Sequence, residues 1–277
     1  MSRHRRRLRL PWWLKLLPLV VLAMALVMPI VWMLSTSFQS AEKMYDLRTD
    51  WIPSVWHFEN YPNALSRLAF RQYFLNSGIV SLIVMASNVV FCTLAGYGLA
   101  KFRFPGDKYV LLLILCTLML PLEVTLVPTF LIIHKLEWLN TYRGLVGPLL
   151  IDAFGIFLMR QAILAVPADY LEAARMDGAG ELRILWRVVV PQCWPSLAVL
   201  AIFSFRDSWD QFLWPLTVVS MDSYRTYPLG LVQLAELYDN PANELMAISV
   251  LATLPVFLVF WILQRSVNRG FGLSGLK

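Results

Sequence analysis

Residues Trp12 to Phe38 read WWLKLLPLVVLAMALVMPIVWMLSTSF, and Lys15 is the one charged residue among these 27. A helix of about 20 apolar residues is long enough to cross the hydrocarbon core of a bilayer. The segment before it is basic and contains Arg3, Arg5, Arg6, Arg7 and Arg9. Such a cluster is attracted to anionic headgroups and holds its end of the chain in the cytoplasm. We therefore predict a basic cytoplasmic N-terminus (1–11) and a first span that is retained rather than cleaved as a signal peptide.

The whole chain has the composition of a membrane protein. Of its 277 residues, 58% are hydrophobic and 15% are charged, and the mean hydropathy is +0.60. A soluble domain is nearer half apolar and a quarter charged. The net charge of +6 does not indicate nucleic-acid binding, because basic residues gather in front of an apolar run.

The three cysteines do not form a recognisable framework. Cys92, Cys116 and Cys193 lie in or beside apolar runs and lack the spacing of metal ligands. Cysteines in such places behave as small hydrophobic residues. We therefore expect three free thiols and no metal site.

Six apolar blocks reach the length of a membrane span. They are Trp12–Phe38, Phe74–Ala100, Tyr109–His134, Gly144–Leu164, Pro195–Ser220 and Leu245–Leu263. Several of the blocks contain proline, and kinks are expected there, because neighbouring helices and water can satisfy the carbonyls that proline leaves free. The predicted fold class is an all-α membrane protein with six transmembrane helices (12–265) and a cytoplasmic tail (266–277).

The distribution of basic residues predicts the side of the membrane on which each segment lies. With the N-terminus inside, the cytoplasmic segments contain sixteen of the 24 Lys and Arg residues and the outer segments contain seven, while Arg206 lies within a span. Cytoplasmic loops are enriched in Lys and Arg, so both termini are predicted to be cytoplasmic. Trp51, Trp56 and Tyr61 in the long outer segment 39–73 are expected to anchor it at the membrane interface.

The predicted cytoplasmic segment Val166–Pro191, between the fourth and fifth spans, is longer than a plain connection requires. Pro167 suits the first turn of a helix, and Gly178 suits its end. Ala173 and Ala174 would give this helix a small-residue surface that another protein can approach closely. A second amphipathic stretch follows and stops at Pro191. We predict two short helices that form a docking surface.

The same segment resembles the loop that is shared by permeases of ABC importers, which reads E-A-A, three residues, G, nine residues and I-x-L-P. The matching residues are Glu172, Ala173, Ala174, Gly178 and Pro191, with Val188 and Val190 at the Ile and Leu positions. Asp177 before the glycine, and Pro167, resemble the carbohydrate branch with its maltose-type permeases. Asp169-Tyr170 stands where that branch usually has Glu-Leu. The alternative interpretation of the segment is an ordinary amphipathic helix at the membrane surface.

Other motifs extend the resemblance over essentially the whole chain. They are Phe58–Tyr61 (F-x-N-Y), Ala95–Lys101 (A-x-Y-A-x-A-R), Met119–Pro121 followed by Pro128 (M-x-P and P), and Trp209–Pro215 (W-N-x-F-x-x-P). The tail Gly270–Lys277 matches the glycine-rich ending of the maltose-type subunit only loosely, because its spacing differs.

The resemblance implies a permease subunit, not an enzyme, in the inner membrane of a prokaryote. It would form half of a translocation pathway for a sugar or a related polyol or glycerol phosphate. Its partners would be a second homologous permease subunit, two ATP-binding subunits, an extracytoplasmic solute-binding protein and membrane lipid. ATP and Mg would be used by the partner ATPase, because this chain has no G-x-x-x-x-G-K-[ST] phosphate loop and is expected to bind no cofactor itself. The residues expected to couple it to the ATPase are Glu172, Ala173, Ala174, Asp177, Gly178 and Pro191.

Polar side chains within the predicted spans are candidates for the translocation pathway. They are Asn88, Glu123, Asp152, Arg206, Asp207, Trp209 and Asp210. An ionised residue at the centre of a membrane helix costs about 2.5–3.5 kcal/mol, so each requires a partner or an aqueous surface.

Two interpretations of these residues stay open at this point. Arg206 and Asp210 lie one helical turn apart and are expected to pair, and Glu123 and Asp152 are further partners for Arg206 across helices. Alternatively, some of them line a cavity for a hydroxyl-rich solute, with Trp209 or Tyr97 as a flat apolar face.

Two other classes of protein compete with this interpretation. An ion-coupled secondary transporter would use Glu123 and Asp152 as proton relays, but it leaves the long spaced loop without a purpose, and no internal repeat is visible. A membrane-embedded hydrolase is disfavoured, because His4, His57 and His134 lie outside the span interiors and neither H-E-x-x-H nor G-x-S-x-G occurs.

Overall fold

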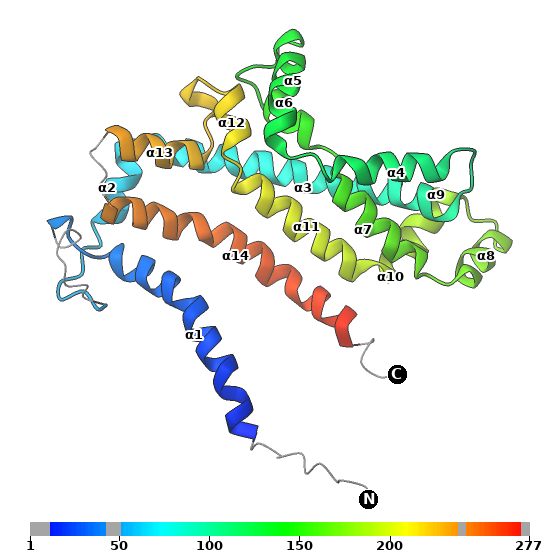
Figure 1. Cartoon of the computed structure of the whole chain (residues 1–277), viewed down its shortest axis with the longest axis horizontal. Coiled ribbons are helices and arrows are strands. Elements are labelled where there is room, and N and C mark those ends of the chain that lie inside the picture. Colours follow the sequence, from blue (N-terminus) through cyan, green and yellow to red (C-terminus); the bar gives the residue numbers. More distant parts are fainter. Residues whose placement is uncertain (1–11, 43–50, 238–241, 273–277) are drawn as a thin grey trace, which may run out of the picture. The chain divides into compact units, whose positions relative to one another are not determined.

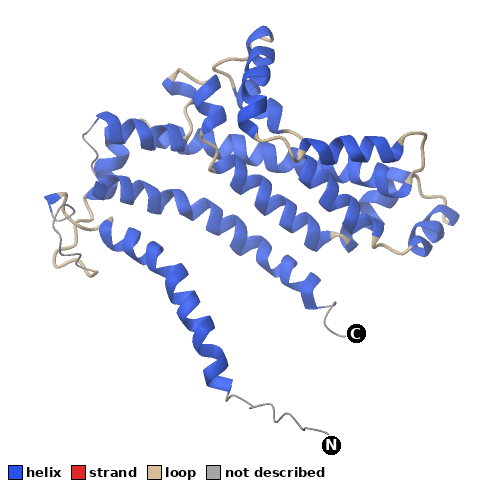
Figure 2. Cartoon of the chain, viewed as in Figure 1, coloured by secondary structure: helices blue, strands red, loops and turns tan. Residues whose placement is uncertain are grey.

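The computed structural model describes residues 12–42, 51–237 and 242–272. The predicted basic N-terminus (1–11) and the last five residues of the predicted tail (273–277) lie outside the described residues. Within the described ranges the chain consists of helices and loops without a strand, so the predicted all-α class is confirmed (Figure 2).

The α-helices follow one another along the chain as labelled in Figure 1, with short η turns between some of them. In the first part of the described residues they are α1 (Trp12–Thr36), α2 (Asn60–Arg67), α3 (Phe70–Lys101), α4 (Asp107–Thr117), α5 (Leu122–Lys135), α6 (Tyr142–Val146), η2 (Gly147–Leu149) and α7 (Ala153–Leu164). The others are α8 (Ala168–Met176), α9 (Glu181–Ile184), η3 (Leu185–Val189), α10 (Val190–Gln192), α11 (Trp194–Trp209), α12 (Leu213–Val218), η4 (Asp222–Tyr224), α13 (Tyr227–Leu237) and α14 (Ala242–Gly272).

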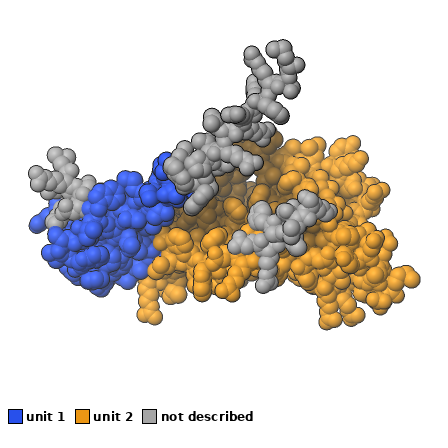
Figure 3. Space-filling model, turned by 90° about the horizontal axis from the view of Figure 1, so that it is seen from below, with its two compact units in different colours: residues 1–67, 234–251 blue, residues 68–233, 252–277 orange. Residues whose placement is uncertain are grey.

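The chain divides into two compact units, which Figure 3 shows in separate colours. Unit 1 comprises residues 1–67 and 234–251, and unit 2 comprises residues 68–233 and 252–277. The described part of unit 1 contains α1, α2, the end of α13 and the beginning of α14. Unit 2 contains most of the predicted spans and both candidate functional regions.

Buried polar side chains hold unit 1 together. The Nδ2 group of Asn60 donates to the carbonyl oxygens of Ser37 and Gln39, both at 2.9 Å, and the Oδ1 atom of Asn60 accepts a bond from Asn243 at 3.0 Å. Next to it, an Nη2–H of Arg67 donates to Oε1 of Glu244 at 2.7 Å. Asn60 belongs to the F-x-N-Y motif, so the motif asparagine joins the ends of α1, α2 and α14 within this unit.

Unit 2 is built around α3, which packs against α7 and α11 (Figure 1). The glycines at their contacts leave no space for a side chain. A Cβ at Gly96 of α3 would lie 2.8 Å from the backbone nitrogen of Arg160 in α7. A Cβ at Gly155 of α7 would lie 2.8 Å from Leu200 of α11 and 2.9 Å from the Sγ atom of Cys92 in α3. The three helices therefore meet at backbone distance, where a side chain larger than hydrogen would separate them.

Three of the predicted spans are continuous helices. The stretches Leu16–Thr36, Phe70–Lys101 and Ala242–Val267 are each long and apolar enough to cross a membrane. They correspond to the first, second and sixth predicted spans. Helix α14 continues to Gly272, so the first seven residues of the predicted tail extend the last helix instead of forming a separate segment.

The other predicted spans are bent or broken. The third is not one helix, because α4 and α5 meet at 103°. Pro121, the N-cap of α5, has no N–H to donate a backbone hydrogen bond to α4. Within the fourth, residues Tyr142–Leu149 and Ala153–Leu164 meet at 45°. The fifth ends as a helix at Trp209, and α12 follows as a separate short helix. If each bent pair counts as one span, up to six helical stretches have the length and composition of spans.

All three cysteines are free thiols, as the sequence predicted. Cys92 and Cys193 are buried, and Cys116 is exposed on α4. Cys92 lies at the contact with Gly155, where it fills the space that the missing side chain leaves.

The close contact between Gly96 of α3 and the backbone of α7 leads to a prediction about stability. Gly96→Ala should lower the melting temperature of the purified chain by several degrees, because the new Cβ meets backbone atoms of α7 and forces a shift that costs about 1–3 kcal/mol. The matched control is Gly98→Ala, two residues along the same helix, where a Cβ has nothing within 4 Å. Alanine favours the helix, so the control should melt at or above the temperature of the wild type. Equal melting temperatures for the two variants would contradict the packing argument.

Candidate coupling loop and polar cavity

The 166–191 loop is folded as two short helices joined by a turn. Helix α8 begins after Pro167 and ends at Met176, Asp177 caps its C-terminus, and Gly178 follows with φ +77°. At this left-handed residue the N–H of Gly178 donates to the carbonyl of Arg175, and the N–H of Ala179 donates to that of Ala174. A residue with a side chain is strained in this conformation, which explains the glycine of the motif.

The loop packs against the same apolar cluster as α3, α7 and α11. Its buried members are Leu171, Ile184, Leu185, Val189 and Val190, beside Met159 and Ile163 of α7 and Leu197 and Leu200 of α11. Each large side chain buried in this way stabilises the arrangement by about 1.5–3 kcal/mol. The loop is therefore packed into the core of unit 2 and is not a flexible surface connection.

The two alanines of the motif have different surroundings. Ala173 is exposed, as is Glu172, whereas Ala174 is partly buried against the chain's own apolar cluster. Of the small-residue surface predicted at both alanines, Ala173 is therefore accessible to another protein, and Ala174 is only partly accessible. Around it, α8 and α9 expose large apolar side chains, with Tyr170, Met176 and Leu182 at 56%, 88% and 67%.

A polar contact joins the loop to α3. The hydroxyl of Tyr97 donates to the Oε2 atom of Glu181 at 2.6 Å, and the Nε–H of Arg175 donates to Oε1 of the same carboxylate at 2.8 Å. One turn further along α3, the Nζ group of Lys101 donates to the carbonyl of Val166 at 2.9 Å. We call Tyr97, Glu181 and Arg175 the latch. Tyr97 is 5% exposed, so it serves this contact and does not offer the free aromatic face expected for a solute.

Pro191 lies where the loop passes into α11. The preceding residues Leu185–Val189 form a π-helical turn, and the N–H of Val190 reaches back to the carbonyl of Leu185. Pro191 has no N–H to continue the pattern. The stretch Glu181–Gln192 meets α11 at 86°, so this part of the loop crosses the end of the helix instead of extending it.

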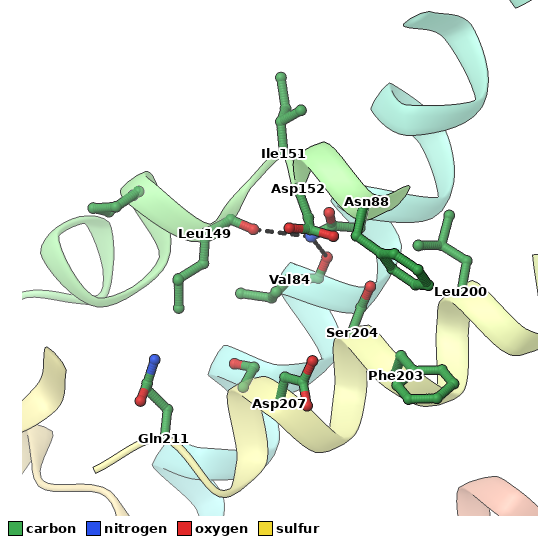
Figure 4. Close-up of a pocket in the computed structure, with 13 residues that line it drawn as sticks. Val84, Asn88, Leu149, Ile151, Asp152, Leu200, Phe203, Ser204, Asp207 and Gln211 are labelled. Atoms are coloured by element: carbon green, nitrogen blue, oxygen red, sulfur yellow. Dashed lines mark hydrogen bonds between the residues drawn. The ribbon is translucent and has the colours of Figure 1, made fainter. Parts of the chain in front are cut away.

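A polar cavity of about 170 Å³ lies between α3, α7 and α11 (Figure 4). Its polar lining residues are Asn88, Asp152, Ser204, Asp207, Ser208 and Gln211, and its apolar ones include Phe154 and Phe203. Ser204 and Asp207 on α11 face the side on which Asn88 and Asp152 lie (Figure 4). Three of the seven residues proposed for the pathway from sequence, Asn88, Asp152 and Asp207, are thus brought to one cavity.

Asn88 and Asp152 also have structural partners. The Nδ2 group of Asn88, which is 1% exposed, donates to the carbonyl oxygens of Val84 at 2.9 Å and Leu149 at 2.8 Å. Asp152 caps α7, because its Oδ2 atom accepts the backbone N–H of Gly155 at 2.9 Å. Asn88 is therefore a fixed wall of the cavity, and Asp152 keeps one carboxylate oxygen for other partners.

Arg206 pairs with two carboxylates on its own helix. Its Nη1 atom lies 3.3 Å from Asp207 Oδ1, and its Nε atom lies 3.5 Å from Asp210 Oδ2, which is the pair expected from the spacing. The side chains of all three are between 46% and 66% exposed. Within the described residues, Arg206 forms no ion pair with Glu123 or Asp152, so these two expected alternatives are wrong for this structure. Glu123 lies in the exposed first turn of α5 and is not part of the cavity lining.

Trp209 has a structural role in unit 2. Its side chain is 2% exposed, and its Nε1–H donates to the carbonyl of Ala252 at 3.0 Å. The ring stacks on Phe205 at 5.7 Å and packs against Tyr227 at 4.9 Å, while the hydroxyl of Tyr227 donates to Asp210 at 2.8 Å. The expectation of a free Trp209 face for the solute is therefore wrong.

Sequence reasoning missed the polar residues of α11 that lie beside Asp207. Ser204, Asp207 and Ser208 follow the helical spacing i, i+3 and i+4, and Gln211, just beyond the end of α11, continues it at i+7, so these residues form one polar stripe. That periodicity is the signal that could have found them. The aromatic lining residues Phe154 and Phe203 had no such signal, because phenylalanine is common throughout the spans.

Comparisons with known proteins agree with this geometry. Residues 88–272 match the family model described as binding-protein-dependent transport system inner membrane component. The arabinooligosaccharides transport system permease protein AraQ of Halalkalibacterium halodurans is 31% identical over 268 residues, which cover 96% of each chain. The sn-glycerol-3-phosphate transport system permease protein UgpE of Yersinia pestis is 34% identical over 221 residues, covering 79% of this chain and 78% of that one.

The fold also has a counterpart among solved structures. A chain of a bacterial ABC transporter involved in the import of the acidic polysaccharide alginate superposes with a TM-score of 0.79 at 24% identity, covering 91% of this chain and 94% of that one. Nothing in these comparisons favours the ion-coupled alternative. The chain belongs to the family of inner membrane components of binding-protein-dependent transport systems, and it is a multi-pass permease subunit of an ATP-driven importer, not an enzyme.

Proposed function

We propose that this permease carries a sugar or a related polyol or glycerol phosphate, and that the 166–191 loop couples it to a separate ATPase. The observation that carries the coupling assignment is the spaced motif folded as two helices on the core shared by α3, α7 and α11. AraQ and UgpE, named for an oligosaccharide and a polyol phosphate, support the solute class.

The proposed topology has six spans with both termini in the cytoplasm. The excess of Lys and Arg on the inner side supports this orientation, with the basic residues 1–11 against anionic lipid. In this topology the 166–191 loop lies inside, and the aromatic residues of segment 39–73 lie at the outer interface. Trp56 and Phe58 are 52% and 63% exposed there, which suits contact with headgroups.

The partners of the proposed complex follow from the division of labour in such importers. A second permease subunit supplies the other half of the pathway, two ATP-binding subunits supply the hydrolysis of ATP with Mg, and an extracytoplasmic binding protein delivers the solute. The coupling residues are Glu172, Ala173, Ala174, Asp177, Gly178 and Pro191. The latch gives the loop a direct connection to α3, so a displacement of α8 and α9 is passed to the helix that lines the cavity.

The pathway is proposed to run along the exposed polar side of α11. Arg206, Asp207 and Asp210 are all at least 46% exposed in a helix of the membrane domain. Ionised side chains within a membrane span are too costly to face lipid, so this side of α11 is proposed to face water or the partner permease. Asn88, Asp152 and Asp207 then form part of the wall of the pathway.

The function is tested by reconstitution. The chain should co-purify from native membranes with an ATPase and a second permease, and the complex in lipid vesicles should take up an oligosaccharide or sn-glycerol 3-phosphate only with ATP and a binding protein. Uptake that needs an ion gradient and no ATP would overturn the proposal.

The coupling loop makes a prediction that the structure sharpens. Ala173→Trp should leave membrane abundance unchanged, because Ala173 is exposed, but should abolish co-purification of the ATPase and uptake, because a bulky side chain keeps the partner away. Ala174→Trp is a poor test, since Ala174 packs on the chain's own core. The matched control is Ala69→Trp, an exposed alanine on the outer side of the proposed topology, which should transport normally. Uptake at the wild-type rate by Ala173→Trp would contradict the assignment of the 166–191 loop as the coupling loop.

The latch makes a second prediction. Tyr97→Phe removes the hydroxyl that donates to Glu181 and keeps the buried ring, so stability should change by only about 1 kcal/mol. Stimulation of ATP hydrolysis by the loaded binding protein should fall several-fold, because the loop loses its contact with α3. Tyr109→Phe, at a tyrosine that is 75% exposed, is the control and should behave as wild type. Full stimulation in Tyr97→Phe would show that the latch plays no part in coupling.

A further inference from the structure

We infer that the cavity between α3, α7 and α11 is a binding site for an uncharged, hydroxyl-bearing solute and rejects anions. The inference rests on the proposed function, and it narrows the solute class within it. Family membership does not distinguish an uncharged solute from an anionic one, because the similar permeases AraQ and UgpE are named for an oligosaccharide and for a phosphate ester. The distinction has to come from the lining residues.

The charge of the lining is negative. Asp152 and Asp207 line the cavity, and among the described residues that line it there is no Lys, Arg or His. Arg206, beside it on α11, is engaged by Asp207 and Asp210, so the group as a whole keeps an excess of carboxylates. A phosphate or carboxylate that entered would be repelled by this excess of negative charge.

The hydrogen-bonding groups of the lining suit hydroxyls. The hydroxyl of Ser208 is buried, with the residue 8% exposed, and its Oγ atom has no hydrogen-bond partner in the described part of the chain. A buried polar group without a partner is costly, so it indicates a position for a ligand or water. Ser204 and Gln211 lie on the same stripe, and the carboxylates accept from hydroxyl donors. A sugar offers both donors and acceptors, whereas an anionic group offers acceptors alone.

The apolar part of the lining suits the faces of a sugar ring. Phe154 and Phe203 line the cavity from α7 and α11, with ring centroids 6.1 Å apart and planes inclined by 65°. Aromatic faces next to a few directed polar groups are the usual composition of small-molecule sites. Phe154 and Phe203 therefore take the role that sequence reasoning had given to Trp209 and Tyr97.

The charge selection can be measured without knowing the solute. We would place Ser204→Cys in a Cys116→Ser background, which leaves Cys92 and Cys193 buried, and assemble the importer in lipid nanodiscs. The probes are two methanethiosulfonates of similar size, one with a trimethylammonium group and one with a sulfonate. Relative to a free thiol in solution, the cationic reagent should react about tenfold faster than the anionic one. With Asp152→Asn and Asp207→Asn added, the ratio should return to that of the free thiol.

Protection by solutes tests the ligand class in the same samples. Arabinotriose or diacetylchitobiose at millimolar concentration should slow the labelling of Ser204→Cys, and sn-glycerol 3-phosphate should not. A rate ratio at or below the free-thiol value, no labelling by either reagent, or protection by the phosphate or by none of the three solutes would each overturn the inference. Gln211→Cys repeats the measurement should Ser204→Cys fail to assemble.

The failure of this inference is distinguishable from failure of the proposed function. If the 166–191 loop does not couple the ATPase, Ala173→Trp transports normally while the labelling ratio at Ser204→Cys is unchanged. If the cavity does not select charge, the ratio of the two labelling rates equals that of a free thiol, while ATP-dependent uptake by the wild type is unaffected.

Discussion

The close approach of α3 to α7 is the contact from which the functional parts of unit 2 are positioned. At Gly96 and Gly155 the backbones meet so closely that any Cβ would collide with backbone or core atoms. Cys92 and Asn88 lie one and two turns before Gly96, respectively, and face the start of α7. There Asn88 donates to the carbonyl of Leu149, and Cys92 fills the space beside Gly155. Tyr97 and Lys101 follow on the same helix and hold the loop. One helix therefore carries the wall of the cavity at one place and the latch at another.

This arrangement explains how a loop can act on a cavity several turns away. A packed interior is nearly incompressible, so elements that share a core shift together instead of deforming independently. The 166–191 loop shares its core with α3, α7 and α11, and its side chains Leu171, Ile184 and Leu185 are almost completely buried there. In the proposed mechanism the exposed side of α8 receives the movement of the ATPase, and the buried side passes it on.

The sequence predicted the elements that depend on local composition. The apolar length of α1, α3 and α14 and the glycine that ends α8 follow from the residues themselves, because helix length and a left-handed turn are local properties. The bend of 103° before α5 could not be predicted from Pro121, since a proline shows that a span can bend and does not fix the angle. The burial of Tyr97 and Trp209 was missed because their partners, Glu181 and the carbonyl of Ala252, are distant in the sequence.

The polar stripe of α11 shows which residues of the candidate site can be predicted from the sequence and which cannot. Arg206, Asp207 and Asp210 were candidates because charge inside a span is costly. Arg206 and Asp210 do pair, yet of the three residues only Asp207 lines the cavity. The neutral residues at the same helical spacing, Ser204 and Ser208, complete the site because they lie on the side of α11 that faces Asn88 and Asp152. Helical spacing identifies residues that share a face, but only the packing of α3 and α7 against that face decides that it closes into a cavity. If the inferred site selects the substrate, that selection is a property of three helices together, held in place by the two glycines at their contact.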